Sequence, residues 1–117
     1  MDVIELRLKK KYFEAVLQGR KVQEFREIRP NNESRFIELD SEGYAVCDDA
    51  GNAKPIPYDA VKFICDDSWV LVKIRESYTE MLVDDAGEPI WYDYYGERYY
   101  AERIVYNLGE IISYECH

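Results

Sequence analysis

The stretch LKKKYFEAVLQGRKVQEFREIRP, residues 8–30, decides the fold, because it joins a helical and a strand pattern around one glycine. Residues 12–17 carry apolar side chains at positions i, i+3 and i+4, which predicts a helix with one apolar stripe. Gly19 stands where a left-handed residue commonly ends a helix. Residues 22–29 alternate in character, which predicts a strand that ends at Pro30.

The same region gathers positive charge within an acidic chain. Residues 1–30 hold eight Lys and Arg against five Asp and Glu, a sum of +3, whereas the remaining residues hold seven against nineteen, a sum of −12. The net charge of −9 disfavours non-specific binding of duplex nucleic acid, since that affinity comes from cations meeting phosphates. The local excess predicts an anion-recognition edge on an acidic body.

Strand patterns dominate the rest of the chain. The ranges that we expect to form strands are 3–8, 36–39, 44–47, 60–65, 101–108 and 109–115, together with a strand that begins at 68 and either continues to 85 or breaks near Glu76. The tetrapeptide DDAG at 48–51 and again at 84–87 predicts two hairpin turns. The pattern predicts a mixed, β-rich α+β fold, a small barrel or a strongly bent sheet with one main helix near the N-terminus packed beside it.

Composition bounds the class of protein. At 117 residues, with 47% hydrophobic and 15% aromatic residues, the chain is expected to form one ordered domain over residues 1–117. Its three cysteines lack C-x-x-C spacing, so no disulfide framework, metal site or cofactor is predicted. The thiols, the lack of an apolar spanning run and the lack of a signal-peptide core predict a cytoplasmic protein with no membrane partner.

A family resemblance rests on Gly19, Lys21, Glu24 and Arg26. Preceded by a strand and an amphipathic helix, these positions resemble the Gly-x-Lys-x-x-Glu-x-Arg signature of ASCH domains, a branch of the PUA-like superfamily. The closing stretch RIVYNLGEII, residues 103–112, also resembles the final strands of that family. The resemblance covers roughly the first quarter and the last tenth of the chain. It implies a PUA-like β-barrel with a cleft beside the first helix, and a role in binding RNA or a nucleotide. We expect the module to be non-catalytic.

The implied ligand-binding residues are Lys21, Glu24 and Arg26, with Lys9 or Lys11 nearby. Lys and Arg only donate hydrogen bonds and an ionised Glu only accepts them. The cations would therefore meet phosphate oxygens, and Glu24 would accept from an exocyclic amine or a sugar hydroxyl. The alternative is that these charges merely pair with one another on a solvated strand.

An enzymatic alternative comes from one branch of the family, small amidohydrolases acting on acetylated cytidine. In that branch a Lys and a Thr, three residues apart, carry the chemistry. Lys21 matches the Lys, but Glu24 stands at the Thr position, and a carboxylate does not replace a hydroxyl nucleophile. His117 is the only histidine and is terminal, and no nucleophile–base spacing is visible, so no catalytic residue is predicted.

Aromatic side chains are dense in residues 91–102, where they alternate with acids such as Asp93 and Glu97. This segment predicts packing together with a protein interface; a stacking surface for bases is the alternative. Its acidity, with the −12 balance after residue 30, also fits an acidic module that mimics nucleic acid. Elsewhere we expect four aromatic side chains in the core: Tyr12, Phe13, Phe25 and Trp69.

Overall fold

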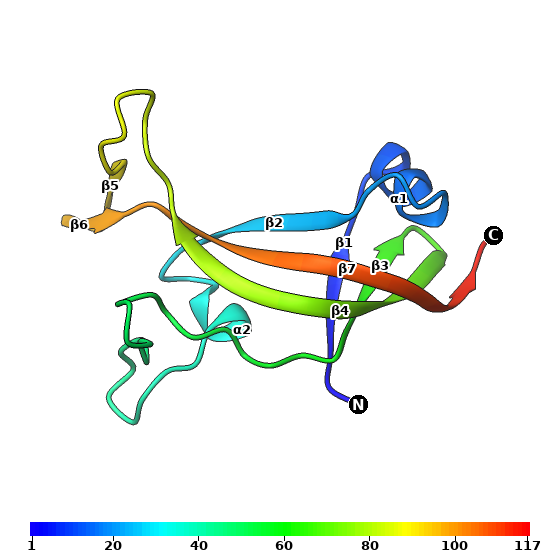
Figure 1. Cartoon of the computed structure of the whole chain (residues 1–117), viewed down its shortest axis with the longest axis horizontal. Coiled ribbons are helices and arrows are strands. Elements are labelled where there is room, and N and C mark those ends of the chain that lie inside the picture. The colour runs from blue at the N-terminus through cyan, green and yellow to red at the C-terminus, as the bar shows by residue number, and fades with distance from the viewer. The chain divides into compact units, whose positions relative to one another are not determined.

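The computed structural model describes residues 1–117 and is rich in strands, with two short helices (Figure 1). The strands are β1 (Val3–Arg7), β2 (Gln23–Ile28), β3 (Ala60–Cys65), β4 (Ser68–Met81), β5 (Trp91–Tyr94), β6 (Glu97–Tyr100) and β7 (Glu102–Glu115). The helices are α1 (Lys10–Leu17) and α2 (Glu33–Phe36). The β-rich α+β class is confirmed, while the PUA-like barrel stays a prediction.

Five strands form one sheet in the order β1-β3-β4-β7-β2, and β5 and β6 form a separate antiparallel pair. β1 runs parallel to β3, and β3 runs antiparallel to β4. Only two residues separate β3 from β4, and Asp66 adopts a left-handed conformation there with φ of 52°. Asp tolerates this region better than most residues, which permits so tight a connection.

The residues group into two compact units. Unit 1 comprises Met1–Glu24, Pro57–Ser77 and Tyr106–His117, and unit 2 comprises Phe25–Ile56 and Tyr78–Val105. Strands β2, β4 and β7 each contribute residues to both units. The single domain expected over residues 1–117 therefore stays a prediction.

In unit 1, α1 packs against β3 and buries Phe13 and Val16. On β3, the side chains of Val61 and Phe63 are completely buried. The prediction that Tyr12 belongs to this core is wrong, because its side chain is 45% exposed. Tyr12 lies one position before the apolar stripe and so falls at its solvent edge.

In unit 2, three turns share one construction. The side chains of Asp40, Asp48 and Asp84 each accept hydrogen bonds from the backbone N–H groups two and four residues later. A glycine with positive φ stands three residues after each aspartate. Both turns predicted from DDAG are therefore confirmed, and residues 40–44 form a third.

Several predicted strand boundaries in and beyond unit 2 are corrected. Residues 36–39 and 44–47 form isolated bridges rather than strands, and α2 takes up Phe36. β4 is continuous through Glu76, and the two strands expected at 101–108 and 109–115 are one strand, β7.

Phe25, also expected in the core, is 39% exposed, and the guanidinium of Arg103 lies 4.2 Å from its ring centroid. The placement of Phe25 in the core is therefore wrong. Trp69 is half-buried on β4, and the ammonium of Lys62 lies 4.9 Å from its ring.

Candidate functional site

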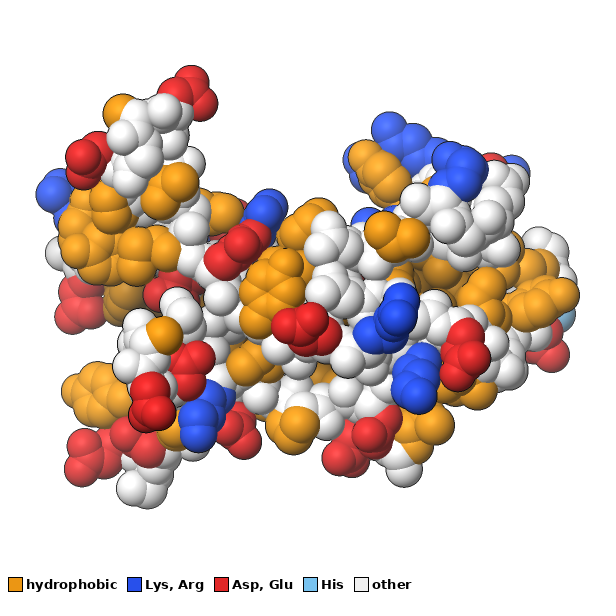
Figure 2. Space-filling view, viewed as in Figure 1, with side chains coloured by type: hydrophobic (Ala, Val, Ile, Leu, Met, Phe, Trp, Pro, Cys, Tyr) orange, Lys and Arg blue, Asp and Glu red, His pale blue; other side chains and the backbone are white.

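A hollow of about 480 Å³ lies beside α1 in unit 1. The residues that line it are Lys11, Tyr12, Glu14, Ala15, Arg20 and Lys21. Figure 2 shows Lys and Arg side chains gathered over α1. Three cations against one carboxylate give the lining a local positive charge in a chain whose net charge is −9.

The turn after α1 delivers two of these cations. Gly19 has φ of 74°, and its N–H donates to the carbonyl of Val16. The carbonyl of Ala15 then accepts from the N–H groups of Arg20 and Lys21, at 2.9 and 3.1 Å. Such glycine-ended turns satisfy the last carbonyls of a helix, and cations are favourable at that end of its dipole. The predicted glycine-ended turn is confirmed.

The ammonium of Lys21 is held on two sides. It donates to the carbonyl oxygen of Gln23 at 2.7 Å and lies 3.2 Å from Oε1 of Glu24. Gln23 is itself fixed, because its side-chain amide donates to Oδ1 of Asn107 at 2.7 Å. Glu24 is only 5% exposed, and this cation offsets part of the cost of burying its carboxylate.

Tyr12 supplies an exposed aromatic face in the same place. The ammonium of Lys11 lies 4.9 Å from its ring centroid and that of Lys21 lies 5.9 Å away. Both distances are within the range of a cation–π attraction. The hollow therefore presents a flat ring with two ammonium groups close to it.

The start of α1 is electrostatically unfavourable. Lys9 is the N-cap and makes no side-chain capping hydrogen bond, and the first turn contains no acidic residue. Lys10 and Lys11 follow directly, although cations near a helix N-terminus oppose its dipole by about 0.3–1 kcal/mol each. An anion bound nearby would relieve this repulsion.

The predicted site residues are only partly brought together. Lys11 and Lys21 line the hollow, whereas Lys9 is exposed outside it. Glu24 does not line the hollow but holds Lys21 in place. Arg26 is half-buried on β2 and belongs to unit 2.

Sequence reasoning missed Tyr12 and Arg20 as members of the site. The signal for Arg20 is its place directly after the helix-ending glycine. The signal for Tyr12 is a ring at the edge of the apolar stripe, directly after three lysines.

Other chemistry is sparse. No group of three or more His, Cys, Asp or Glu side chains is placed to hold a metal ion. The imidazole of His117 lies 3.2 Å from the carboxylate of Glu115. Neither α1 nor α2 has the length and apolar character needed to span a bilayer. Comparison with protein-family models, curated proteins and solved structures finds no match to this chain.

Proposed function

We propose that the hollow beside α1 binds a nucleotide unit, either free or within single-stranded RNA. The observation that carries the proposal is the exposed ring of Tyr12 with the ammonium groups of Lys11 and Lys21 close to it. A nucleotide combines a flat base with an anionic phosphate, and single-stranded nucleic acid is commonly bound by aromatic platforms combined with cations.

The charges around the hollow support this assignment. Arg20 makes its side-chain hydrogen bond to the neutral amide of Gln18, and Lys11 has no ion pair. Two cations thus lack a carboxylate partner in a chain with 24 acidic residues. Their charge is available for phosphate oxygens, and the planar guanidinium of Arg20 suits two oxygens at once.

Non-catalytic binding fits the environment of Lys21. Its ammonium is occupied by the carbonyl of Gln23 and the carboxylate of Glu24, which leaves one of its three N–H groups for a ligand. Glu24 takes the position of the hydroxyl nucleophile in the amidohydrolase branch and is buried. This arrangement supports a role for Lys21 in fixing a ligand rather than in chemistry.

The test measures binding of two probes by the intact chain. Fluorescence anisotropy with a short labelled single-stranded RNA reports the polymer, and NMR titration with AMP and CMP reports the free nucleotide. Replacing Tyr12 with Leu removes the ring but keeps an apolar side chain, and should weaken binding about tenfold or more, since one stacked base contributes about 1–3 kcal/mol. Lys11→Ala should weaken RNA binding and flatten its salt dependence, by a slope of about 0.7 for each phosphate that the protein no longer neutralises.

Lys54→Ala is the matched control, because Lys54 is an exposed lysine of unit 2. It removes the same charge and should leave both affinities unchanged. The proposal is wrong if neither probe binds at millimolar concentration, or if Tyr12→Leu binds as tightly as the parent chain. RNA binding without AMP or CMP binding would assign the polymer as the ligand, and the reverse would assign the free nucleotide.

A further inference from the structure

A second pocket lies wholly within unit 2, where strands β5 and β6 form a two-stranded hairpin. Its volume is about 290 Å³, at the lower end of the ~300–1,000 Å³ typical of small-molecule sites. Its lining includes the rings of Trp91, Tyr92, Tyr99 and Tyr100, together with two arginines and two glutamates. This size suits a single side chain better than a nucleotide.

Aromatic rings form much of the pocket. Trp91 and Tyr100 face each other across the hairpin with ring centroids 3.6 Å apart, and Tyr92 and Tyr99 stack at 5.7 Å. The hairpin closes through a two-residue turn in which Tyr95 and the glycine after it both have positive φ. This turn type matches the twist of paired strands and fixes their register, so the rings are presented in a defined order. Figure 2 shows hydrophobic side chains gathered over β5 and β6 with acidic side chains around them.

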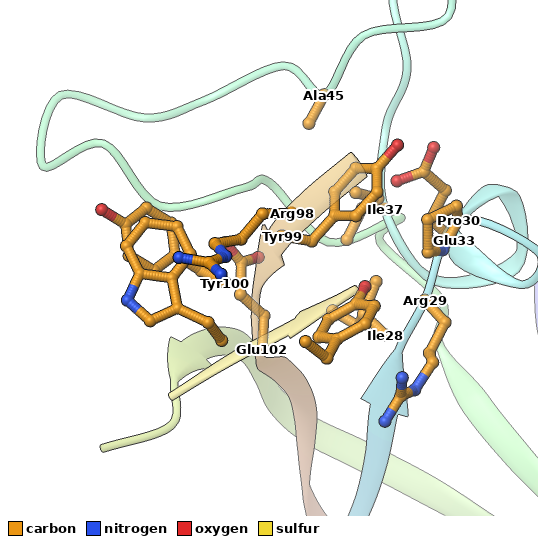
Figure 3. A pocket seen from close by; sticks show the side chains of 12 residues that line it. Ile28, Arg29, Pro30, Glu33, Ile37, Ala45, Arg98, Tyr99, Tyr100 and Glu102 are labelled. Carbon is orange, nitrogen blue, oxygen red and sulfur yellow. The ribbon is translucent and has the colours of Figure 1, made fainter. Parts of the chain in front are cut away.

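Two carboxylates belong to the same lining, those of Glu33 and Glu102. Neither makes a hydrogen bond or an ion pair through its side chain. Burial raises the pKa of both groups, and the charge of Glu33 raises the pKa of Glu102 further. In the view of Figure 3 the two residues lie on opposite sides of the Tyr99 ring.

The two arginines of the lining do not neutralise these acids. Arg29 is paired with Glu27 at 2.6 Å, and Arg98 lies 3.7 Å from the carboxylate of Asp93. Figure 3 shows the guanidinium of Arg29 directed away from the carboxylate of Glu33. Two negative charges therefore remain without a counter-ion beside aromatic rings.

We propose that this pocket binds the guanidinium of an arginine side chain from a basic segment of a partner protein. A guanidinium is planar and stacks on aromatic faces, and its fork of N–H donors matches carboxylates. The unit already uses this stacking, since the guanidinium of Arg29 lies 4.2 Å from the ring centroid of Tyr92. Charge complementarity with Glu33 and Glu102 selects a cation, and the aromatic surround selects a flat one.

The experiment uses the full chain and three small probes: N-acetyl-arginine amide, its uncharged isostere N-acetyl-citrulline amide, and N-acetyl-lysine amide. Two-dimensional NMR titration follows the backbone signals of residues 28–33 and 91–102. The arginine probe should give saturable shifts there. The citrulline probe should bind at least about tenfold more weakly, because it keeps the shape but not the charge. The lysine probe should fall between them.

Variants then test the two carboxylates. Glu33→Gln and Glu102→Gln should each weaken arginine binding about tenfold while the spectrum stays folded. Glu88→Gln is the matched control: it removes an exposed carboxylate of the same unit and should change nothing.

Equal binding of arginine and citrulline, equal binding of arginine and lysine, or no binding of arginine would each overturn the assignment. So would unchanged affinity in both Gln variants. This pocket and the hollow beside α1 share no lining residue. Failure of the arginine-binding proposal therefore leaves the nucleotide-binding proposal unaffected, and the reverse also holds.

Discussion

Replacing Lys21 with Met should destabilise the protein strongly, because it removes the cation from a buried carboxylate. The side chain of Glu24 is 7% exposed and that of Lys21 is 18% exposed. Breaking a buried ion pair by removing one partner typically lowers the free energy of unfolding by about 3–5 kcal/mol. Water reaches the Lys21 side of this pair, so we expect a loss near the lower end, about 3 kcal/mol.

The double variant Lys21→Met/Glu24→Gln should recover most of that loss. It removes both charges of the pair together, so no buried carboxylate has lost its Lys21 counter-ion. Met keeps an apolar stem of similar length, so the variant changes mainly the charge. The hydrogen bond from Lys21 to the carbonyl of Gln23 is absent from both variants and therefore cancels in their comparison.

Urea unfolding measures these differences. With a slope of about 2 kcal/mol/M, a loss of about 3 kcal/mol lowers the midpoint by roughly 1.5 M. Lys62→Met is the matched control, since Lys62 pairs with Glu5 at 4.0 Å with side chains 34% and 61% exposed, in the same unit. An exposed pair of this kind contributes only about 0–1 kcal/mol. Equal shifts for Lys21→Met and Lys62→Met, or a double variant no more stable than Lys21→Met, would refute the reasoning.

Three further changes have defined outcomes. Gly19→Ala should lower the free energy of unfolding by about 1–2 kcal/mol in a urea titration, because φ is 74° there although an added Cβ meets no atom within 4 Å. Phe63→Ala should lower it by about 3–5 kcal/mol, since the ring is completely buried on β3. Glu102→Gln should raise the melting temperature at pH 7, because burial raises the pKa of Glu102 and makes its ionised form unfavourable in the folded state. This gain in melting temperature should vanish below the ordinary pKa of 4.5, where the carboxyl group is protonated in both the folded and the unfolded state. Thermal melts between pH 3 and 7 measure the difference.

The parts of the fold that local chemistry determines could be predicted from the sequence. The strand at 60–65 matches β3 residue for residue, because a short run of β-branched and aromatic residues is bounded by turn formers. The helix and its end at Gly19 follow from an apolar stripe and the one residue that tolerates positive φ. The Asp-based turns follow because the side chain of Asp bonds its own backbone.

The orientation of β2 could not be predicted in the same way. Each of its faces mixes charged and apolar residues, so alternation alone does not say which face is buried. Glu24 is the buried residue and Phe25 the exposed one. The turn after α1 brings Lys21 to Glu24, which lowers the cost of burying this carboxylate, and that contact depends on three-dimensional geometry.

The site residues also divide into those that the sequence predicts and those that only the three-dimensional structure brings together. Two of the expected residues line the hollow: Lys21 was expected from the resemblance to the ASCH signature, and Lys11 from the local gathering of positive charge. The pocket of unit 2 could not, because it combines Glu33 with Glu102, residues that are far apart in the sequence. The aromatic segment 91–102 was recognisable, but its ligand chemistry depends on the second carboxylate.

The charge distribution of the chain has a physical explanation if both proposals hold. Exposed charges elsewhere on the surface would keep the protein soluble. Solubility therefore does not explain why Lys11 and Arg20 beside α1, or Glu33 and Glu102 in the aromatic pocket, lack partners of opposite charge. In each place like charges lie together without counter-ions, and this arrangement lowers stability. Such a cost in stability is retained where a ligand of opposite charge completes the site.

Added salt should therefore stabilise both regions in the absence of ligand and weaken ligand binding at both, because it screens repulsion and attraction alike. Hydrogen exchange of residues 9–21 and 91–102 at low and high salt, measured without ligand, checks the first effect. Exchange rates that do not respond to salt would show that these charges repel too weakly to need a partner.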